Sequence, residues 1–409
     1  MYTINAGDFV SDYARHSRSG SRTTTSTDSS TSTETTESNA AALENMPKEQ
    51  VMIYLTQNSV THQNDEIPET LAALQKADQS GLGKKSMIPI SDPFADGHKT
   101  DQYAFGQSKA DSMTWWHDDA TLKSGQVRIG DQVLSLGAAE SDIEQSAITQ
   151  IRTDWKTALE HVGVPSTKAK GVIDALMTSN DGTAQLMHSG GRACNELLQL
   201  ISVLNRAEMG EFEISSFVIS GHHYRGTTYI FGEMGDHEYD SDQTTGDTLD
   251  VRDIEKLSTV FPKAFAQVDS FMFSACNTHD LGLEDEQGND RSTGDWVSST
   301  FPEAERMALW KDIAPGSDYA AFISGEFALD IAKEENGQNT AFDDLTFKKT
   351  QKGTHHRYEK GADGTMSEIE TKRTRDSYPH YNDYKGLRNS NHEAFHKRSD
   401  LMQYILKKS

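Results

Sequence analysis

Two short apolar runs in the middle of the chain predict buried strands. Residues 217–221 read FVISG and residues 271–275 read FMFSA. Continuous apolar runs of this length are typical of strands buried on both faces, as in a parallel sheet covered by helices. Similar runs at 51–55 and 306–310 predict an earlier and a later strand.

Apolar residues at helical spacing lie between and around these runs. Residues 141–161 begin with a capping-box pattern and continue with a helical repeat of apolar positions. Further helices are expected over 192–209, between 249 and 265, and over 317–333. Strands that alternate with crossover helices indicate an α/β fold with a mostly parallel central sheet.

Composition changes along the chain suggest four parts. Residues 1–48 are rich in Ser and Thr, which predicts a disordered leader; a secretion or processing segment is the other reading. Residues 49–139 have weak periodicity and an unclear fold, and residues 140–340 hold the alternating strands and helices. Residues 341–409 carry more Lys and Arg than Asp and Glu, so this extension is expected to be a solvated surface, to dock on the acidic body or to bind an acidic partner.

The overall composition limits the partners and the compartment. The 409 residues include 39 Lys and Arg against 63 Asp and Glu, and the formal net charge is −24. Such a surplus disfavours binding to nucleic acid or to an anionic membrane. No run approaches the roughly 18 apolar residues of a membrane span, and the first residues lack an apolar signal core. We expect a cytoplasmic protein without a membrane span, with signal-independent secretion left open.

The two cysteines have different surroundings. They are too few for a disulfide framework, which fits a reducing compartment. Cys194 lies on the apolar face of the helix expected over 192–209 and is interpreted as a small core residue. Cys276 directly follows the second apolar run, and His222 follows the first, 54 residues earlier. Function gathers beyond the carboxyl ends of parallel strands, so these residues are candidates for a thiol nucleophile and its imidazole base.

A thiol that attacks a carbonyl also needs hydrogen-bond donors for the negative charge that develops on oxygen. The backbone N–H groups of His223 and Cys276 stand at the two strand ends and are candidates for this role. Such a scheme needs no metal and no cofactor.

These strand ends resemble those of the caspase-like (clan CD) cysteine peptidases, which include caspases, metacaspases, gingipains and bacterial CHAT-domain proteases. The matching residues read ISGH at 219–222 and SACNT at 274–278. By element order the resemblance covers roughly residues 190–335. It implies a three-layer α/β sandwich, a peptidase that acts on proteins or peptides, His222 as the general base and acid, and Cys276 as the nucleophile.

The residue after the histidine departs from the family pattern. A small residue usually stands there, whereas this chain has His223. Its side chain crowds the oxyanion site, and either His222 or His223 could face the sulfur. The register of the motif favours His222.

The substrate preference rests on weaker signals. Acidic residues crowd the two loops beside the expected site, and Asp269 or Asp280 could hold a basic side chain of the substrate. Cleavage after basic residues is the resulting hypothesis, and ordinary solvated loop acids are the alternative. Self-cleavage in the leader or in a long loop is also possible.

A metal site is one alternative function. Zinc could be held by nitrogen and sulfur ligands, although no C-x-x-C or H-E-x-x-H spacing is present. Calcium could bind the acidic loop at 285–290, which does not follow the EF-hand pattern. The candidate zinc ligands are His222, His223, His237, Cys276 and His279.

Two further alternatives use the same fold differently. The domain could be a catalytically inert caspase-like scaffold or binding module, because a fold alone does not establish activity. A serine hydrolase is a weaker alternative, since Ser220 and Ser324 precede glycines but neither lies in a G-x-S-x-G motif.

Overall fold

The computed structural model describes the residues around a central sheet. These are 49–57, 85–91, 125–129, 131–137, 145–191, 193–231, 248–285, 287–311 and 355–369, with the shorter pieces 70, 73–74, 78, 81, 113–114, 314 and 327. The expected leader at 1–48 and the helix expected over 317–333, apart from residue 327, lie outside the described residues.

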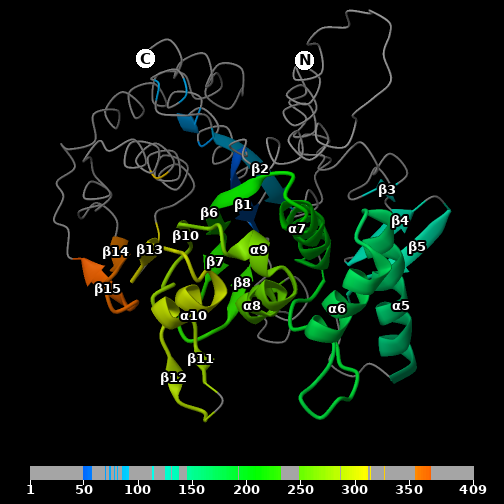
Figure 1. Ribbon diagram of the computed structural model, residues 1–409. Helices are drawn as coiled ribbons and strands as arrows, with labels where there is room; N and C mark the ends of the chain where they lie inside the picture. Colours follow the sequence, from blue (N-terminus) through cyan, green and yellow to red (C-terminus); the bar gives the residue numbers. More distant parts are fainter. Residues whose placement is uncertain are drawn as a thin grey trace, which may run out of the picture.

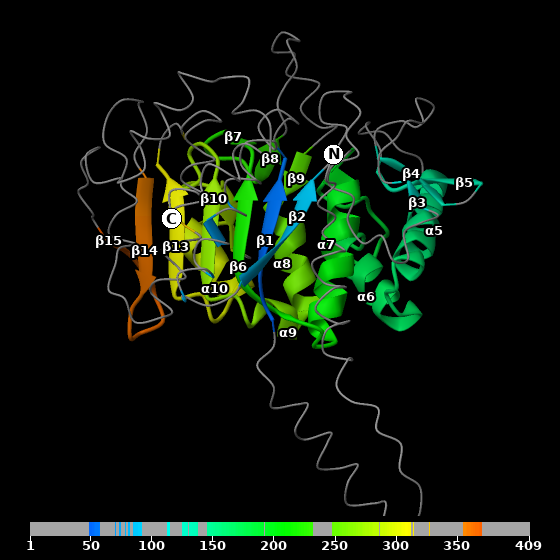
Figure 2. The ribbon, with the colours of Figure 1, turned by 90° about the horizontal axis from the view of Figure 1, so that it is seen from above.

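A seven-stranded sheet has the strand order β15-β14-β13-β10-β6-β1-β2 (Figure 2). The first five of its strands along the chain run parallel to one another, β14 pairs antiparallel with β13, and β15 pairs antiparallel with β14. The mostly parallel sheet expected from the apolar runs is therefore confirmed. The strands are β1 (Gln50–Thr56), β2 (Lys85–Ser91), β6 (Glu213–Ser220), β10 (Ser270–Ser274), β13 (Arg306–Trp310), β14 (His355–Lys360) and β15 (Met366–Ile369).

The helices at 193–208, 251–265 and 293–300 cover one face of this sheet, and those at 145–161 and 166–176 pack against them further out (Figure 1). Phe217 and Phe271 point from neighbouring strands into the core, where Phe271 lies 5.1 Å from Phe301 between ring centroids. Side chains of the opposite face, such as Tyr54 and Met272, are fully buried as well, which explains why the strands are apolar at successive positions. The helices are α5 (Gln145–His161), α6 (Ser166–Leu176), α7 (Ala193–Glu208), α8 (Val251–Val260), α9 (Pro262–Phe265) and α10 (Thr293–Thr300).

Three small sheets surround the central one. β3 (Met113–Thr114), β4 (Gln126–Ile129) and β5 (Gln132–Ser135) form one of them, which is joined to α5 where Trp155 Nε1 donates to the carbonyl of Leu136 at 2.6 Å. A second sheet, beside the carboxyl end of β6, contains β7 (His222–His223), β8 (Tyr229–Phe231) and β9 (Thr248–Asp250). The third is the hairpin of β11 (Leu283–Glu284) and β12 (Asp290–Arg291).

The predicted division into four parts differs from the observed fold. β1 and β2 come from the predicted region 49–139, yet β1 pairs with β6 over its whole length. β14 and β15 come from the predicted extension 341–409, yet β14 pairs with β13. Strands from both flanking regions thus belong to the same sheet as the central region, and such pairing leaves no local mark in composition.

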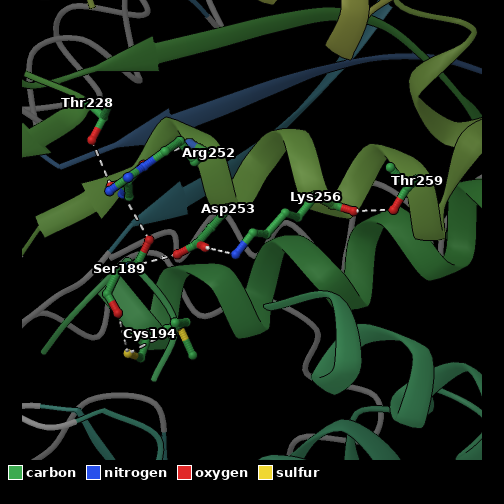
Figure 3. Close-up of polar contacts among 9 residues, drawn as sticks. Ser189, Cys194, Thr228, Arg252, Asp253, Lys256 and Thr259 are labelled. Atoms are coloured by element: carbon green, nitrogen blue, oxygen red, sulfur yellow. Dashed lines mark hydrogen bonds and ion pairs between the residues drawn. The ribbon is translucent and has the colours of Figure 1, made fainter. Parts of the chain in front are cut away.

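A buried polar cluster joins the start of α8 to the segment before α7 (Figure 3). Asp250 caps α8 by accepting from the N–H of Arg252, and it also forms an ion pair with the Arg252 guanidinium at 2.6 Å. Asp253 accepts from the N–H of Ser189 at 2.6 Å and lies 3.9 Å from Lys256 Nζ. Burial raises the pKa of Asp253 to about 6, and the neighbouring Asp250 adds to this effect.

Asp253→Asn should change how stability depends on pH. The pKa of Asp253 is about 6 in the folded protein against 3.8 as its ordinary value, so the folded state holds the proton more tightly. This group therefore lowers the free energy of unfolding as pH rises from about 4 to about 6, by about 3 kcal/mol in all. Asparagine removes this titration and still offers an oxygen to the N–H of Ser189.

Urea unfolding at pH 4, 5, 6 and 7 measures the effect in both proteins. Taking the difference between them cancels the contribution of other groups, such as His188, whose pKa burial lowers to about 4. We expect Asp253→Asn to gain stability relative to the wild type as pH rises. Parallel curves for the two proteins would contradict this.

Candidate active site

The carboxyl ends of β6 and β10 lie next to each other. The two strands are parallel, and Ser220 pairs with Ser274 at their last shared position. Gly221 continues the contact, because its N–H donates to the carbonyl of Ser274 at 3.2 Å. His222 and Cys276 each follow two residues after the paired serines, so the structure brings their segments to the same edge of the sheet.

The two adjacent histidines of β7 face different environments. The side chain of His222 is exposed, whereas His223 is only 2% exposed. His223 Nδ1 lies 2.8 Å from the carbonyl oxygen of Cys276, and its Nε2 lies 2.8 Å from the carbonyl oxygen of Thr227. Burial lowers the pKa of His223, although the two carbonyl acceptors oppose that effect. With both ring nitrogens against carbonyls, His223 is not placed to accept the proton of the thiol.

Cys276 has a half-buried side chain in contact with a third strand end. Its Sγ accepts a hydrogen bond from the N–H of Ala314 at 3.2 Å, and Ala314 follows β13. Burial raises the pKa of the Cys276 thiol above its ordinary value, and the N–H of Ala314 partly offsets this. The sulfur is therefore a thiol at neutral pH and needs a base before it can attack. The role of Ala314 leaves no signal in the sequence, because a donor on the backbone has no side-chain signature.

The loop that follows Cys276 is held in an unusual conformation. Asn277 has φ of 54°, and among the described residues it alone combines a positive φ with a side chain other than that of glycine. The buried Thr278 fixes the next turn, since its Oγ1 accepts from the N–H of Trp310 and its carbonyl accepts from Thr293 Oγ1 at 2.8 Å. Backbone outliers of this kind cluster at functional sites and persist only where surrounding contacts enforce them.

This loop also packs tightly against the turn after β7. The N–H of Gly226 donates to the carbonyl of Asp280 at 3.1 Å, and Arg225 Nε donates to the Asp280 carboxylate at 3.0 Å. Gly282 has φ of 60°, and a Cβ there would lie 2.3 Å from the carbonyl oxygen of Gly226. Only glycine fits at this position without moving one of the two loops.

The two candidate substrate carboxylates lie at opposite edges of the sheet. Asp269 directly precedes β10, whereas Cys276 follows it, and the five residues of the strand span about 17 Å. The structure therefore does not bring Asp269 together with Cys276, because a strand carries its two ends to opposite edges of the sheet. Asp280 lies in the loop after Cys276. Burial would raise the pKa of Asp280, but hydrogen bonds from Arg225 and the N–H of Gly282 outweigh it and hold the pKa below its ordinary value.

Gln57 is a further polar residue at this edge that sequence reasoning missed. It follows β1, and its N–H donates to the carbonyl of Ser220 at 2.8 Å. The side chain is 5% exposed, and among the described residues its Nε2 has no hydrogen-bond partner. Leaving a buried amide donor without a hydrogen bond costs free energy of folding. This donor belongs to a residue that lies beside the end of β6. Its only sequence signal is a polar residue after an apolar run.

The residues proposed as metal ligands do not form a cluster in the described part of the chain. No group of three or more His, Cys, Asp or Glu side chains that could hold a metal is found there, and His237 lies outside it. In the acidic loop, Asp285 Oδ1 instead accepts from the N–H groups of Gln287 and Asn289. This closes the turn between β11 and β12, as expected of an ordinary loop. None of the described helices is both long and apolar enough to cross a membrane.

Comparisons with known proteins add little to this geometry. No protein-family model matches the chain, and no curated protein matches its sequence. Among solved structures it is similar to a secreted C11 cysteine protease from Bacteroides thetaiotaomicron, iotapain, at 10% identity and a TM-score of 0.30. The match covers 77% of this chain and 67% of that chain. A likeness at this level does not establish a shared fold, so the function of the chain has to be argued from its own residues.

Gly282→Ala should destabilise the loop that follows Cys276. The left-handed backbone alone costs a non-glycine residue about 1–2 kcal/mol, and the contact with the Gly226 carbonyl adds to it. We expect a loss of about 2–4 kcal/mol in the free energy of unfolding, measured with urea. Gly288→Ala is the matched control, because Gly288 has φ of 78° and open space around its Cβ position. Equal losses in the two variants would contradict the close packing of the two loops.

Proposed function

We propose that this chain is a cysteine peptidase in which Cys276 is the nucleophile and His222 is the general base and acid. The observation that carries the proposal is the parallel pairing of β6 with β10, which brings the segments of these residues to one sheet edge. The half-buried sulfur, the exposed imidazole and the strained backbone at Asn277 support it. Each is a property expected of a nucleophile site.

The first half of the reaction transfers an acyl group to the enzyme. His222 takes the proton of the thiol, and Sγ of Cys276 forms a bond to the carbonyl carbon of the substrate. The carbon–nitrogen bond then breaks, and the leaving amine takes the proton from His222. A thioester on Cys276 remains.

The second half restores the enzyme. A water molecule gives a proton to His222 and attacks the thioester, after which the carbon–sulfur bond breaks and the proton returns to Sγ. One peptide bond and one water become a carboxylic acid and an amine. Backbone N–H groups of His223 and Cys276 are the donors proposed for the oxyanion in both halves.

The electrostatics of the site favour a neutral Cys276 thiol that a base deprotonates during the reaction over a preformed thiolate–imidazolium ion pair. Because burial raises the pKa of Cys276, the sulfur keeps its proton until His222 removes it. His222 is the better candidate for the base because both ring nitrogens of His223 already contact carbonyl oxygens. The proposed preference for basic residues before the scissile bond depends on Asp280. Its carboxylate would bind the basic side chain of the substrate in place of Arg225, with which it forms an ion pair.

An inert binding module is the second candidate function. The observation in its favour is the same raised pKa of the Cys276 thiol, since many reactive cysteines have a lowered one. Turnover and thiol reactivity distinguish the two functions.

Cys276→Ala and His222→Ala should each abolish peptide cleavage. Both substitutions remove a group that takes part in bond breaking, and neither side chain belongs to the apolar core cluster. The measurement is thiol-dependent cleavage of a positional-scanning fluorogenic peptide library, and thermal unfolding reports the fold of each variant. We expect losses of at least about 10³-fold in kcat/KM. A Cys276→Ala protein with wild-type activity would end the proposal, and a preference for Asp before the cut would end the proposed role of Asp280.

The alkylation of Cys276 by iodoacetamide should report its raised pKa. The thiolate is the reactive species, so the rate should rise through pH 9.0 with its midpoint above that value, because burial disfavours the charged form. Mass spectrometry separates Cys276 from the fully buried Cys194, which should stay unmodified. A midpoint near neutral pH would instead indicate a preformed thiolate–imidazolium pair and contradict the base-assisted scheme.

A further inference from the structure

The ring of His223 bridges two backbone carbonyls that belong to different loops. One is the carbonyl of Cys276 and the other is that of Thr227, each 2.8 Å from a ring nitrogen. A neutral imidazole can donate to one of them and a protonated imidazole to both. The ring is 2% exposed, so water does not compete for these contacts.

The contact at Nδ1 acts on the peptide group that follows the candidate nucleophile. The Cys276 carbonyl lies in the bond to Asn277, whose left-handed backbone depends on the orientation of that peptide. The Cα of Cys276 carries both this carbonyl and the side chain, whose Sγ accepts a hydrogen bond from the N–H of Ala314. Holding the carbonyl therefore restrains the backbone from which the sulfur extends.

The contact at Nε2 connects the ring to a rigid support. Thr227 also donates through Oγ1 to the carbonyl of Tyr224, which closes its turn. The next residue, Thr228, donates through Oγ1 to Asp250 at 2.8 Å, and Asp250 is the fully buried cap of α8. The ring thus ties the loop of Cys276 to the start of a helix in the core.

We propose that His223 is a positioning residue, which holds the sulfur of Cys276 in place for attack by clamping the Cys276 carbonyl to the turn at Thr227. The inference rests on the proposed peptidase function. In this role the side chain of His223 takes part in no bond-forming or bond-breaking step. A displacement of the reacting sulfur by about 1 Å is enough to lower turnover about 100-fold.

His223→Phe and His223→Gln separate this role from simple filling of space. Phenylalanine keeps a planar ring and loses the ring nitrogens, whereas the amide NH2 of glutamine can still donate to a carbonyl. In the full-length chain, with the peptide that the wild type cleaves fastest, we expect His223→Phe to lower kcat about 10- to 100-fold with KM within about twofold. His223→Gln should recover a large part of this loss.

Alkylation by iodoacetamide gives a readout that moves in the opposite direction. Once the clamp is lost, Sγ of Cys276 becomes more exposed, and its alkylation in His223→Phe should become several-fold faster while kcat falls. Cys194 is fully buried in the core and is the internal control for unfolding. Faster modification of Cys276 with Cys194 still protected supports the inference.

Several outcomes would overturn it. Wild-type kcat in His223→Phe, or equal losses in both variants, would show that the hydrogen bond from the ring does not position the sulfur. If Cys194 becomes reactive in His223→Phe, that variant has opened its core, and a second measurement is used. This is ¹⁵N NMR of the imidazole rings in the wild-type protein, where the signals of His223 are assigned by their loss in His223→Gln. A proton on Nδ1 of His223 supports donation to the Cys276 carbonyl, and an unprotonated Nδ1 overturns it.

Failure of the proposed function gives a different pattern. If the wild type cleaves no peptide, or if Cys276→Ala cleaves as well as the wild type, the peptidase proposal fails whatever His223 does. The alkylation experiment then still decides whether His223 controls the position of Cys276. An unchanged rate at Cys276 in His223→Phe would overturn that control.

Discussion

The parallel pairing of β6 with β10 is the constraint on which the candidate site depends. Parallel strands point their carboxyl ends to the same edge, and the register sets Ser220 opposite Ser274. The residues that directly follow the two strands therefore lie at the same edge of the sheet, and they include His222, His223 and Cys276. Apolar side chains bury both faces of the two strands, so a shift of register would expose or mispair a large part of the core.

Beyond the strand ends, backbone contacts arrange the site more than side-chain pairs do. The carbonyl of Cys276 contacts the ring of His223, and the sulfur of Cys276 accepts a hydrogen bond from the N–H of Ala314. The unusual backbone of Asn277 persists because these contacts, together with the buried Thr278, enforce it. Burial raises the pKa of the Cys276 thiol, so at neutral pH a base has to remove its proton before the sulfur can act as a nucleophile.

Much of the fold could be predicted from local pattern. The strands at 213–220, 270–274 and 306–310 and the helices at 193–208 and 251–260 lie close to where apolar runs and helical repeats placed them. The membership of β1 and β14 in the same sheet could not be predicted, since pairing over long distances in sequence leaves no periodic signal. The separation of Asp269 from Cys276 follows from the local pattern, because a strand between the two residues carries them to its opposite ends.

The apolar pattern along the chain was enough to predict which segments become buried strands, and a histidine and a cysteine stand just beyond two of them. Apolar run length and residue chemistry are local properties, so they can be read without coordinates. The folded chain was needed to see that His223 turns inward to two carbonyls while His222 stays exposed, and that Ala314 donates to the sulfur. These assignments depend on loops from three strand ends meeting in space, where burial and backbone donors act on groups that are far apart along the chain.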